Sequence, residues 1–139
     1  MKKVEDIVTI KVSSEPGSLK TIRQVVQKAA QLAGCDEKLV QNLVLAVTEA
    51  SMNIIQHAYQ GNPNGAILLQ IQKVDSQLEF CLIDYGLPSC ADEIKPRQLD
   101  ELRPGGLGCH FIKHVMDEVQ YLNLNKGAGN KLLMIKRIN

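Results

Sequence analysis

Three polar side chains recur at intervals of four residues: Glu49, Asn53 and His57. Each interval rotates an α-helix by about 40° beyond a full turn, so the three would project along one stripe. Small apolar residues flank this stripe, and a buried carboxylate, amide and imidazole need partners. A bound metal–phosphate group would supply them, because an amide oxygen suits Mg²⁺ and a glutamate can deprotonate a nucleophile. A polar stripe that faces solvent is the alternative that this segment alone leaves open.

A second candidate, Asp84, ends an apolar segment and is followed two residues later by Gly86. A carboxylate at such a position can accept a hydrogen bond from the amino group of adenine, while Gly86 lets the chain turn closely over the base. Because Asp-x-Gly also ends many strands as ordinary turn chemistry, the motif alone is a weak indication of a binding site.

A third candidate is the cluster Gly105, Gly106, Leu107 and Gly108, which precedes an apolar segment with helical spacing. Glycines let backbone N–H groups approach an anion, and the amino end of a helix adds a favourable dipole. A lone glycine cluster is more often a plain entry to a helix. It does not match the P-loop, because no Gly-Lys-Ser/Thr sequence follows it.

The spacing of apolar residues predicts the elements that must position these motifs. Gly34 is expected to end the first helix, and Asp36 to cap the second. The order of elements predicts one α/β (α+β) domain over residues 1–139, a two-layer sandwich with helices on one face of a mixed, mainly antiparallel sheet. The predicted strands cover residues 8–12, 67–74, 78–83, 119–125 and 131–138, and the predicted helices cover 19–32, 36–59 and 106–116.

Composition narrows the classes of function. The chain has 45% hydrophobic and 22% charged residues and a formal net charge of +1, without a basic cluster, so we expect no nucleic-acid partner. No apolar run approaches the length of a membrane span, so we expect no membrane association. The four cysteines lack the close spacing of a disulfide or metal framework, which favours reduced thiols in a cytoplasm.

In this order, the three motifs resemble those of the GHKL ATPases, the Bergerat-fold group of DNA gyrase, heat-shock chaperones, sensor histidine kinases and mismatch-repair ATPases. Residues 48–58 are similar to the N box of that group, residues 84–86 to its first glycine box and residues 105–108 to its second. The bacterial anti-sigma-factor serine/threonine kinase branch is the nearer match and covers almost the whole chain. Its further similarities are residues 14–19, an Arg23-bearing helix, residues 45–50, residues 116–119 and the terminal Lys136-Arg137.

The resemblance implies ATP and Mg²⁺ as cofactors and a role for each residue of the N box. Asn53 would coordinate Mg²⁺, Glu49 would act as the base toward a substrate hydroxyl, and His57 would lie near the phosphates. Each of these three roles is carried over from the family to the one matching residue of this chain.

The resemblance also implies roles for the glycine motifs. Asp84 would read adenine beside Gly86, and the backbone of residues 105–108 would contact phosphate. Residues 87–104 would form a short ATP lid whose arginines could reach the nucleotide or the substrate. Two departures stand out: Asn130 occupies a place near the last strand where relatives often carry threonine, and the start of the lid lacks the aromatic–aspartate pair common in this branch. Asparagine can also form hydrogen bonds, so Asn130 is kept as a nucleotide-binding candidate.

The function that the resemblance implies is transfer of the γ-phosphoryl group of ATP to a serine or threonine of an antagonist protein (anti-anti-sigma, STAS-type). The kinase would also bind a sigma factor or a similar regulator and form a homodimer. An ATP-gated binding module with little phosphotransfer is an alternative, which the altered lid favours and the intact Glu49 opposes. A histidine-kinase-like catalytic domain is a further alternative, less favoured because no phosphoacceptor hairpin is expected before the domain.

Overall fold

The structure is a computed structural model, and residues 1–87, 106–123 and 129–138 are described, with residues 106–109 described by their backbone alone. The strands are β1 (Val4–Ser13), β2 (Ala66–Val74), β3 (Gln77–Asp84), β4 (Glu118–Asn123) and β5 (Asn130–Arg137). The helices are α1 (Ser18–Leu32), α2 (Glu37–Asn53) and α4 (Gly106–Val115), and a π-helix, η1 (Ile54–Ala58), follows α2 directly.

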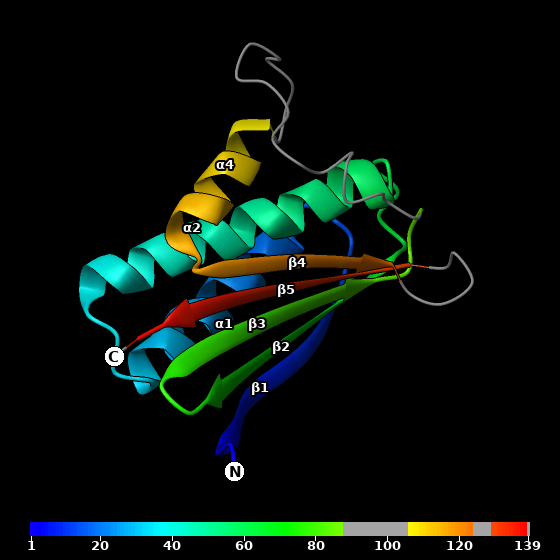
Figure 1. Cartoon of the computed structure of the whole chain (residues 1–139). Helices are drawn as coiled ribbons and strands as arrows, with labels where there is room; N and C mark the ends of the chain where they lie inside the picture. Colours follow the sequence, from blue (N-terminus) through cyan, green and yellow to red (C-terminus); the bar gives the residue numbers. More distant parts are fainter. Residues whose placement is uncertain (88–105, 124–128, 139) are drawn as a thin grey trace.

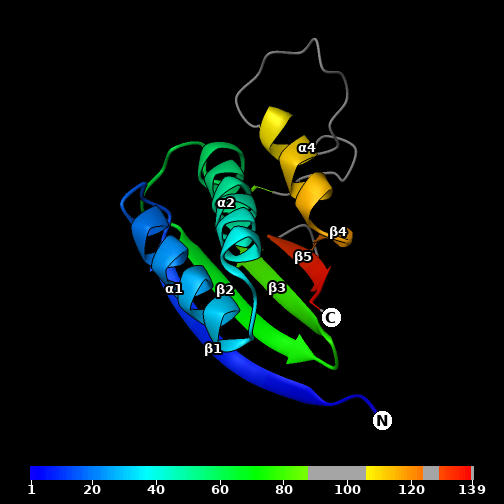
Figure 2. The same ribbon diagram turned by 90° about the vertical axis from the view of Figure 1, so that its left-hand side faces the viewer.

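The described residues form two layers (Figures 1 and 2). The five strands form one sheet in the order β1-β2-β3-β5-β4, and α1, α2 and α4 lie on one of its faces. The predicted α+β sandwich is therefore confirmed. The sheet was predicted to be mixed and mainly antiparallel. All four strand pairings among the described residues are antiparallel.

The turns that the sequence predicted around α1 and α2 are present. Gly34 has a φ of 89°, which is the left-handed conformation expected of a glycine just after a helix. Asp36 caps α2, and its Oδ1 accepts a hydrogen bond from the backbone N–H of Leu39 at 2.8 Å. These two residues lie in the turn between α1 and α2, the helix that carries Glu49 and Asn53.

A single apolar core fills the space between the helices and the sheet. Inward-facing residues alternate along β2, where Ile67, Leu69 and Ile71 are fully buried. Phe80, at the centre of β3, is the largest of the fully buried side chains. The other fully buried side chains with the greatest volume are Ile22, Leu43, Leu78, Leu82, Ile112, Met134, Val26 and Val47.

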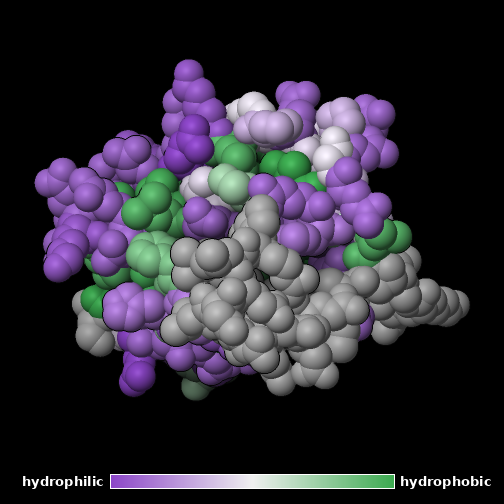
Figure 3. Space-filling model, turned by 90° about the horizontal axis from the view of Figure 1, so that it is seen from above, coloured by the Kyte–Doolittle hydropathy of each residue, from purple (hydrophilic) through white to green (hydrophobic). Residues whose placement is uncertain are grey.

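The helical side of the molecule presents mostly hydrophilic side chains with smaller apolar areas between them (Figure 3). Two exposed leucines belong to its helices: Leu32 of α1 is 69% exposed and Leu45 of α2 is 52% exposed. Within residues 1–87, 106–123 and 129–138, no helix combines the length and the apolar character that crossing a membrane requires.

Candidate functional site

Asp84 is the last residue of β3 and a buried carboxylate, with 2% of its surface exposed. Its Oδ1 accepts two hydrogen bonds, from Nδ2 of Asn130 at 2.9 Å and from the backbone N–H of Gly86 at 3.0 Å. Burial raises the pKa of this carboxyl above its usual value, and the two hydrogen bonds act in the opposite direction. Both hydrogen bonds that the described residues donate to this carboxylate end on Oδ1.

Asn130 is the first residue of β5 and lies directly opposite Asp84 in the β3–β5 register. Besides its bond to Asp84, Nδ2 donates to the carbonyl oxygen of Leu87 at 2.9 Å. Asn130 thus joins Asp84 to the segment that leaves the strand. The structure brings Asp84, Gly86 and Asn130 together.

Gly86 contacts the end of η1 so closely that no side chain fits. A Cβ at this position would lie 2.4 Å from the carbonyl oxygen of Ala58 and 2.9 Å from its Cβ. The next residue, Leu87, donates its backbone N–H to the same oxygen of Ala58 at 2.8 Å. The glycine is therefore required for packing against η1, in addition to any approach to a base.

The helix that carries Glu49 and Asn53 changes its winding at Ile54. Residues 54–58 form a π-helix, closed by the bond from the backbone N–H of Tyr59 to the carbonyl oxygen of Ile54 at 3.1 Å. Sequence analysis predicted an uninterrupted helix to Tyr59. No glycine or proline marks the change, so the spacing of apolar residues gave no sign of it. Short π segments within helices are rare and frequent at functional sites.

Two of the three N-box side chains have a similar degree of burial in the structure. Glu49 and Asn53 are both half-buried and are separated by about 6 Å along the axis of α2. His57 is exposed and lies in the π-helix, where the four-residue spacing of an α-helix no longer applies. Glu49 and Asn53 thus share a similar degree of burial, and His57 is more exposed than either.

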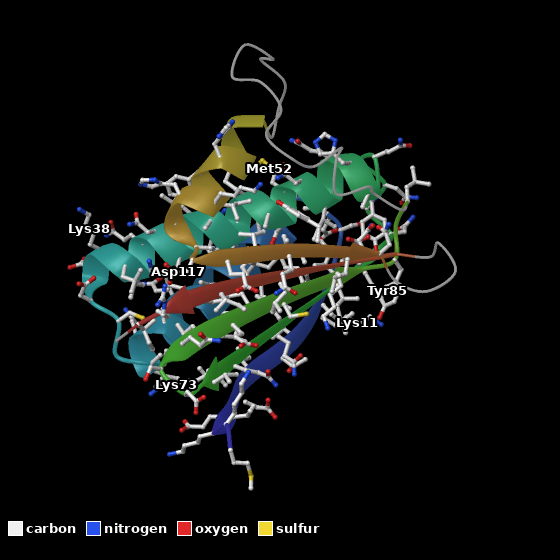
Figure 4. The ribbon with its side chains drawn as sticks, in the orientation of Figure 1. Lys11, Lys38, Met52, Lys73, Tyr85 and Asp117 are labelled. Atoms are coloured by element: carbon white, nitrogen blue, oxygen red, sulfur yellow. The ribbon has the colours of Figure 1, made fainter. Side chains whose placement is uncertain are left out.

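Figure 4 shows how the site is arranged relative to the sheet. Tyr85 lies at the edge of the sheet where β3 ends and β5 begins, and Met52 lies on α2, above the sheet and next to α4. Helices α2 and α4 are in contact. In Figure 2 the amino end of α4 and the carboxyl end of α2 point toward the same side of the molecule. The backbone of Gly106, Leu107 and Gly108 forms the first turn of α4, whereas Gly105 and the predicted lid lie outside the described residues.

The carboxyl end of α4 is fixed by Asp117 (Figure 4). Its Oδ2 accepts the backbone N–H of Arg137 at 2.6 Å, and Nζ of Lys136 lies 3.7 Å from its Oδ1. Two sequence motifs that resembled the kinase branch, residues 116–119 and the terminal basic pair, therefore meet in space. Their contact ties α4 to β5, the strand that supplies Asn130.

The chain belongs to the histidine kinase-like ATPase domain family, whose model matches residues 12–136. The predicted GHKL-type membership is thereby confirmed. Curated relatives are similar over the whole chain. Serine-protein kinase RsbW of Bacillus subtilis (strain 168) is 29% identical over 147 residues, which cover 100% of this chain and 90% of the relative. Serine-protein kinase RsbW of Listeria innocua is also 29% identical, with 92% of the relative covered.

Solved structures share the fold at low sequence identity. The structure of the RsbU and RsbW domains of a Mycobacterium tuberculosis protein superposes with a TM-score of 0.67 and 14% identity, covering 94% of this chain and 31% of that one. The catalytic domain of histidine kinase ThkA gives a TM-score of 0.55 at 11% identity, covering 95% of this chain and 97% of that one. These similarities show that the two-layer architecture is that of the family.

Proposed function

We propose that the protein is an anti-sigma-factor-type serine/threonine protein kinase that binds Mg-ATP and phosphorylates an antagonist (anti-anti-sigma, STAS-type) protein. One observation supports this most: the buried Asp84 is anchored by Asn130 and followed by a turn packed on the end of η1. That end continues the helix of Glu49 and Asn53. An adenine-reading carboxylate and the N-box residues are therefore parts of one site.

Asp84 provides the adenine contact of this proposal. Its Oδ1 is held by Asn130 and Gly86, which fixes the direction of Oδ2. The amino group of adenine donates to such an acceptor, whereas guanine presents a carbonyl at the same place and would repel it. The site should therefore prefer ATP to GTP.

Asn53 provides the protein's ligand for Mg²⁺. Among the described residues there is no cluster of three or more His, Cys, Asp or Glu side chains that could hold a metal. A site with an amide oxygen suits Mg²⁺, because this ion takes one or two protein ligands and completes its shell with phosphate oxygens and water. When bound, Mg²⁺ neutralises negative charge on the phosphates.

Glu49 acts as the general base. It lies one helical turn before Asn53 and is half-buried, so it is near the metal ligand without being withdrawn from an approaching substrate. It takes the proton of the serine or threonine hydroxyl as the oxygen attacks the γ-phosphorus. The bond between the γ-phosphorus and the β–γ bridging oxygen breaks, and ADP leaves. The backbone of Gly106, Leu107 and Gly108, at the amino end of α4, supplies N–H groups to phosphate, together with Gly105. His57, exposed on η1, would approach the phosphates from the solvent side.

The partners follow from the serine-protein kinases that resemble this chain. An antagonist protein would accept the phosphoryl group, and a sigma factor or similar regulator would bind the unoccupied kinase, which acts as a homodimer. A cytoplasmic location fits the use of ATP and the free thiols of Cys35 and Cys81.

The test is phosphotransfer from radiolabelled ATP to a purified STAS-type antagonist protein. Transfer to a serine or threonine, dependent on Mg²⁺, is the expected result. If the protein binds ATP and transfers nothing, it is an ATP-gated binding module. If the label appears on histidine instead, it is a histidine-kinase-like catalytic domain.

A further inference from the structure

Tyr59 is the first residue after η1 and belongs to none of the motifs described so far. Its ring covers Gly65, where a Cβ would lie 2.3 Å from Cε1 of the tyrosine. The ring therefore holds the connection between η1 and β2 in place, and only glycine fits beneath it.

The hydroxyl of Tyr59 makes two hydrogen bonds of opposite sense. It donates to the carbonyl oxygen of Ala66 at 2.5 Å, and it accepts the backbone N–H of Tyr85 at 2.8 Å. Burial raises the pKa of this phenol, which keeps it in the protonated form that the bond to Ala66 requires. One oxygen atom thus joins the end of η1, the start of β2 and the residue next to Asp84.

The bond to Tyr85 is one of three consecutive contacts between η1 and the turn after β3. Tyr85 bonds to the Tyr59 hydroxyl, Gly86 packs on Ala58, and Leu87 donates to the Ala58 carbonyl oxygen. The Leu87 bond joins two backbone atoms and would survive most substitutions, and the Gly86 contact requires a glycine at position 86. The contact of Tyr85 depends on a single side-chain atom, the hydroxyl oxygen of Tyr59. Of the three contacting residues, Tyr85 is also the closest in sequence to Asp84.

We propose that Tyr59 is a positioning residue of the nucleotide site, whose hydroxyl fixes the turn at residues 84–86 against η1 and so sets the place of the Asp84 carboxylate relative to Asn53. This inference rests on the proposed function, in which Asp84 binds adenine. A purely structural tyrosine would contribute to the folded state through its ring on Gly65 and leave the affinity for ATP unchanged.

Tyr59→Phe separates the two roles, because phenylalanine keeps the ring and loses both hydrogen bonds. Ser14 supplies a matched control. Its buried hydroxyl also donates to one carbonyl and accepts one N–H, bonding Asn62 at 2.6 Å and Gly65 at 2.9 Å. Ser14→Ala therefore removes a comparable pair of bonds from the neighbouring connection without touching the turn at residues 84–86.

The measurement is the Kd of Mg-ATP by calorimetry, at a temperature where all three proteins are folded. Tyr59→Phe is expected to weaken ATP binding by about threefold to tenfold, the net value of one hydrogen bond. Its preference for ATP over GTP should fall by a similar factor, while Ser14→Ala binds ATP as the wild type does. Unchanged ATP affinity in Tyr59→Phe, or an equal loss in Ser14→Ala, would overturn the proposal. If the wild type itself binds no ATP, the proposed function fails and this inference with it.

Hydrogen exchange decides the matter if Tyr59→Phe does not fold. The Tyr85 amide is bonded to the Tyr59 hydroxyl, and the Gly65 amide is bonded to the Ser14 hydroxyl. In the wild type, Mg-ATP should slow hydrogen exchange of the Tyr85 amide and leave the exchange of the Gly65 amide unchanged. Equal effects on both amides, or none on Tyr85, would overturn the role of Tyr59 while leaving ATP binding established.

Discussion

Asn130 donates hydrogen bonds from one nitrogen, Nδ2, to Oδ1 of Asp84 and to the carbonyl oxygen of Leu87, each at 2.9 Å. A threonine hydroxyl has a single hydrogen to donate and could serve only one of these acceptors at a time. The asparagine thus holds both the carboxylate and the segment that follows it. Asp84 is consequently the residue on which the nucleotide site can be tested most directly.

Asp84→Asn should weaken ATP binding. An amide can present N–H groups where the adenine amino group needs an acceptor, and a mismatched buried polar contact costs about 1–3 kcal/mol. Calorimetry with ATP and GTP measures this, and the wild type should bind GTP poorly. Glu79→Gln is the control, since Glu79 is a carboxylate of the same strand outside this site, bonded to Gln77. Equal affinity of the wild type for ATP and GTP would count against the adenine pocket.

The same substitution should make the folded protein more stable at neutral pH. The raised pKa of Asp84 means that the folded protein holds this proton more tightly than the unfolded chain does. Between the unfolded and the folded pKa the native state binds more protons, so stability falls as pH rises through that window. Asp84→Asn removes this penalty, because the amide carries no charge.

Thermal melts of wild type and Asp84→Asn at several pH values measure this effect. The variant should have the higher Tm at neutral pH, and the difference should shrink once the pH falls below about 4, the ordinary pKa of aspartate. A difference that is the same at both ends of the range would mean that the ionisation of Asp84 does not affect stability.

Gly86→Ala should destabilise the fold. A new Cβ would overlap the carbonyl oxygen of Ala58, which is backbone and cannot rotate away. Overpacking of this kind typically costs about 1–3 kcal/mol in the free energy of unfolding. Gly17→Ala is the matched control, because a Cβ there would have its nearest neighbour at 3.9 Å. Denaturant unfolding of both variants measures the difference, and similar midpoints would show that the contact with Ala58 relaxes easily.

Asn53→Ala should remove the Mg²⁺-dependent part of the affinity for ATP and leave the fold intact. The side chain is half-buried at the end of α2, so its truncation empties little core volume. Calorimetry with ATP, with and without Mg²⁺, measures this. Asn42→Ala, another half-buried asparagine of α2, serves as control. If Asn53→Ala binds Mg-ATP like the wild type, the assignment of the N box is wrong.

The order of elements could be predicted because local signals were strong. Apolar spacing marked the strands and the α-helices of the described residues, and Gly34 and Asp36 marked the turn between α1 and α2. The start of β1 was predicted too late, at Val8 instead of Val4, because the β1–β2 register shifts between Asp6 and Val8. A bulge of this kind breaks the alternation of apolar residues that reveals a strand.

The parts of the site that depend on long-range packing could not be predicted in the same way. Family motifs pointed to Asp84 and Asn130, but their hydrogen bond depends on the pairing of β3 with β5. Neither the π-helix nor the bond between Tyr59 and Tyr85 leaves a sequence pattern. The one sequence feature that points to Tyr59 is a large residue followed, across a turn, by Gly65, on which its ring packs.

Glu49→Gln should slow phosphotransfer and leave ATP affinity almost unchanged. Glutamine keeps the shape and one acceptor oxygen of the side chain but cannot take the proton of the substrate hydroxyl. The loss of a general base typically lowers a rate by about 10²–10⁴-fold. ATP is held by other groups in this proposal, namely Asp84, Asn53 with its Mg²⁺, and backbone N–H groups, so its Kd should change little.

The assay is transfer from radiolabelled ATP to the antagonist protein, with a melting curve of each variant. Glu37→Gln is the matched control, because Glu37 lies on the same helix but about 18 Å away along its axis and is exposed. If Glu49 serves only as a partner for a nearby cation, Glu49→Gln lowers the Tm and keeps its activity per folded molecule. Unaltered transfer by folded Glu49→Gln would therefore exclude Glu49 as the base, even if the wild type proves to be an active kinase.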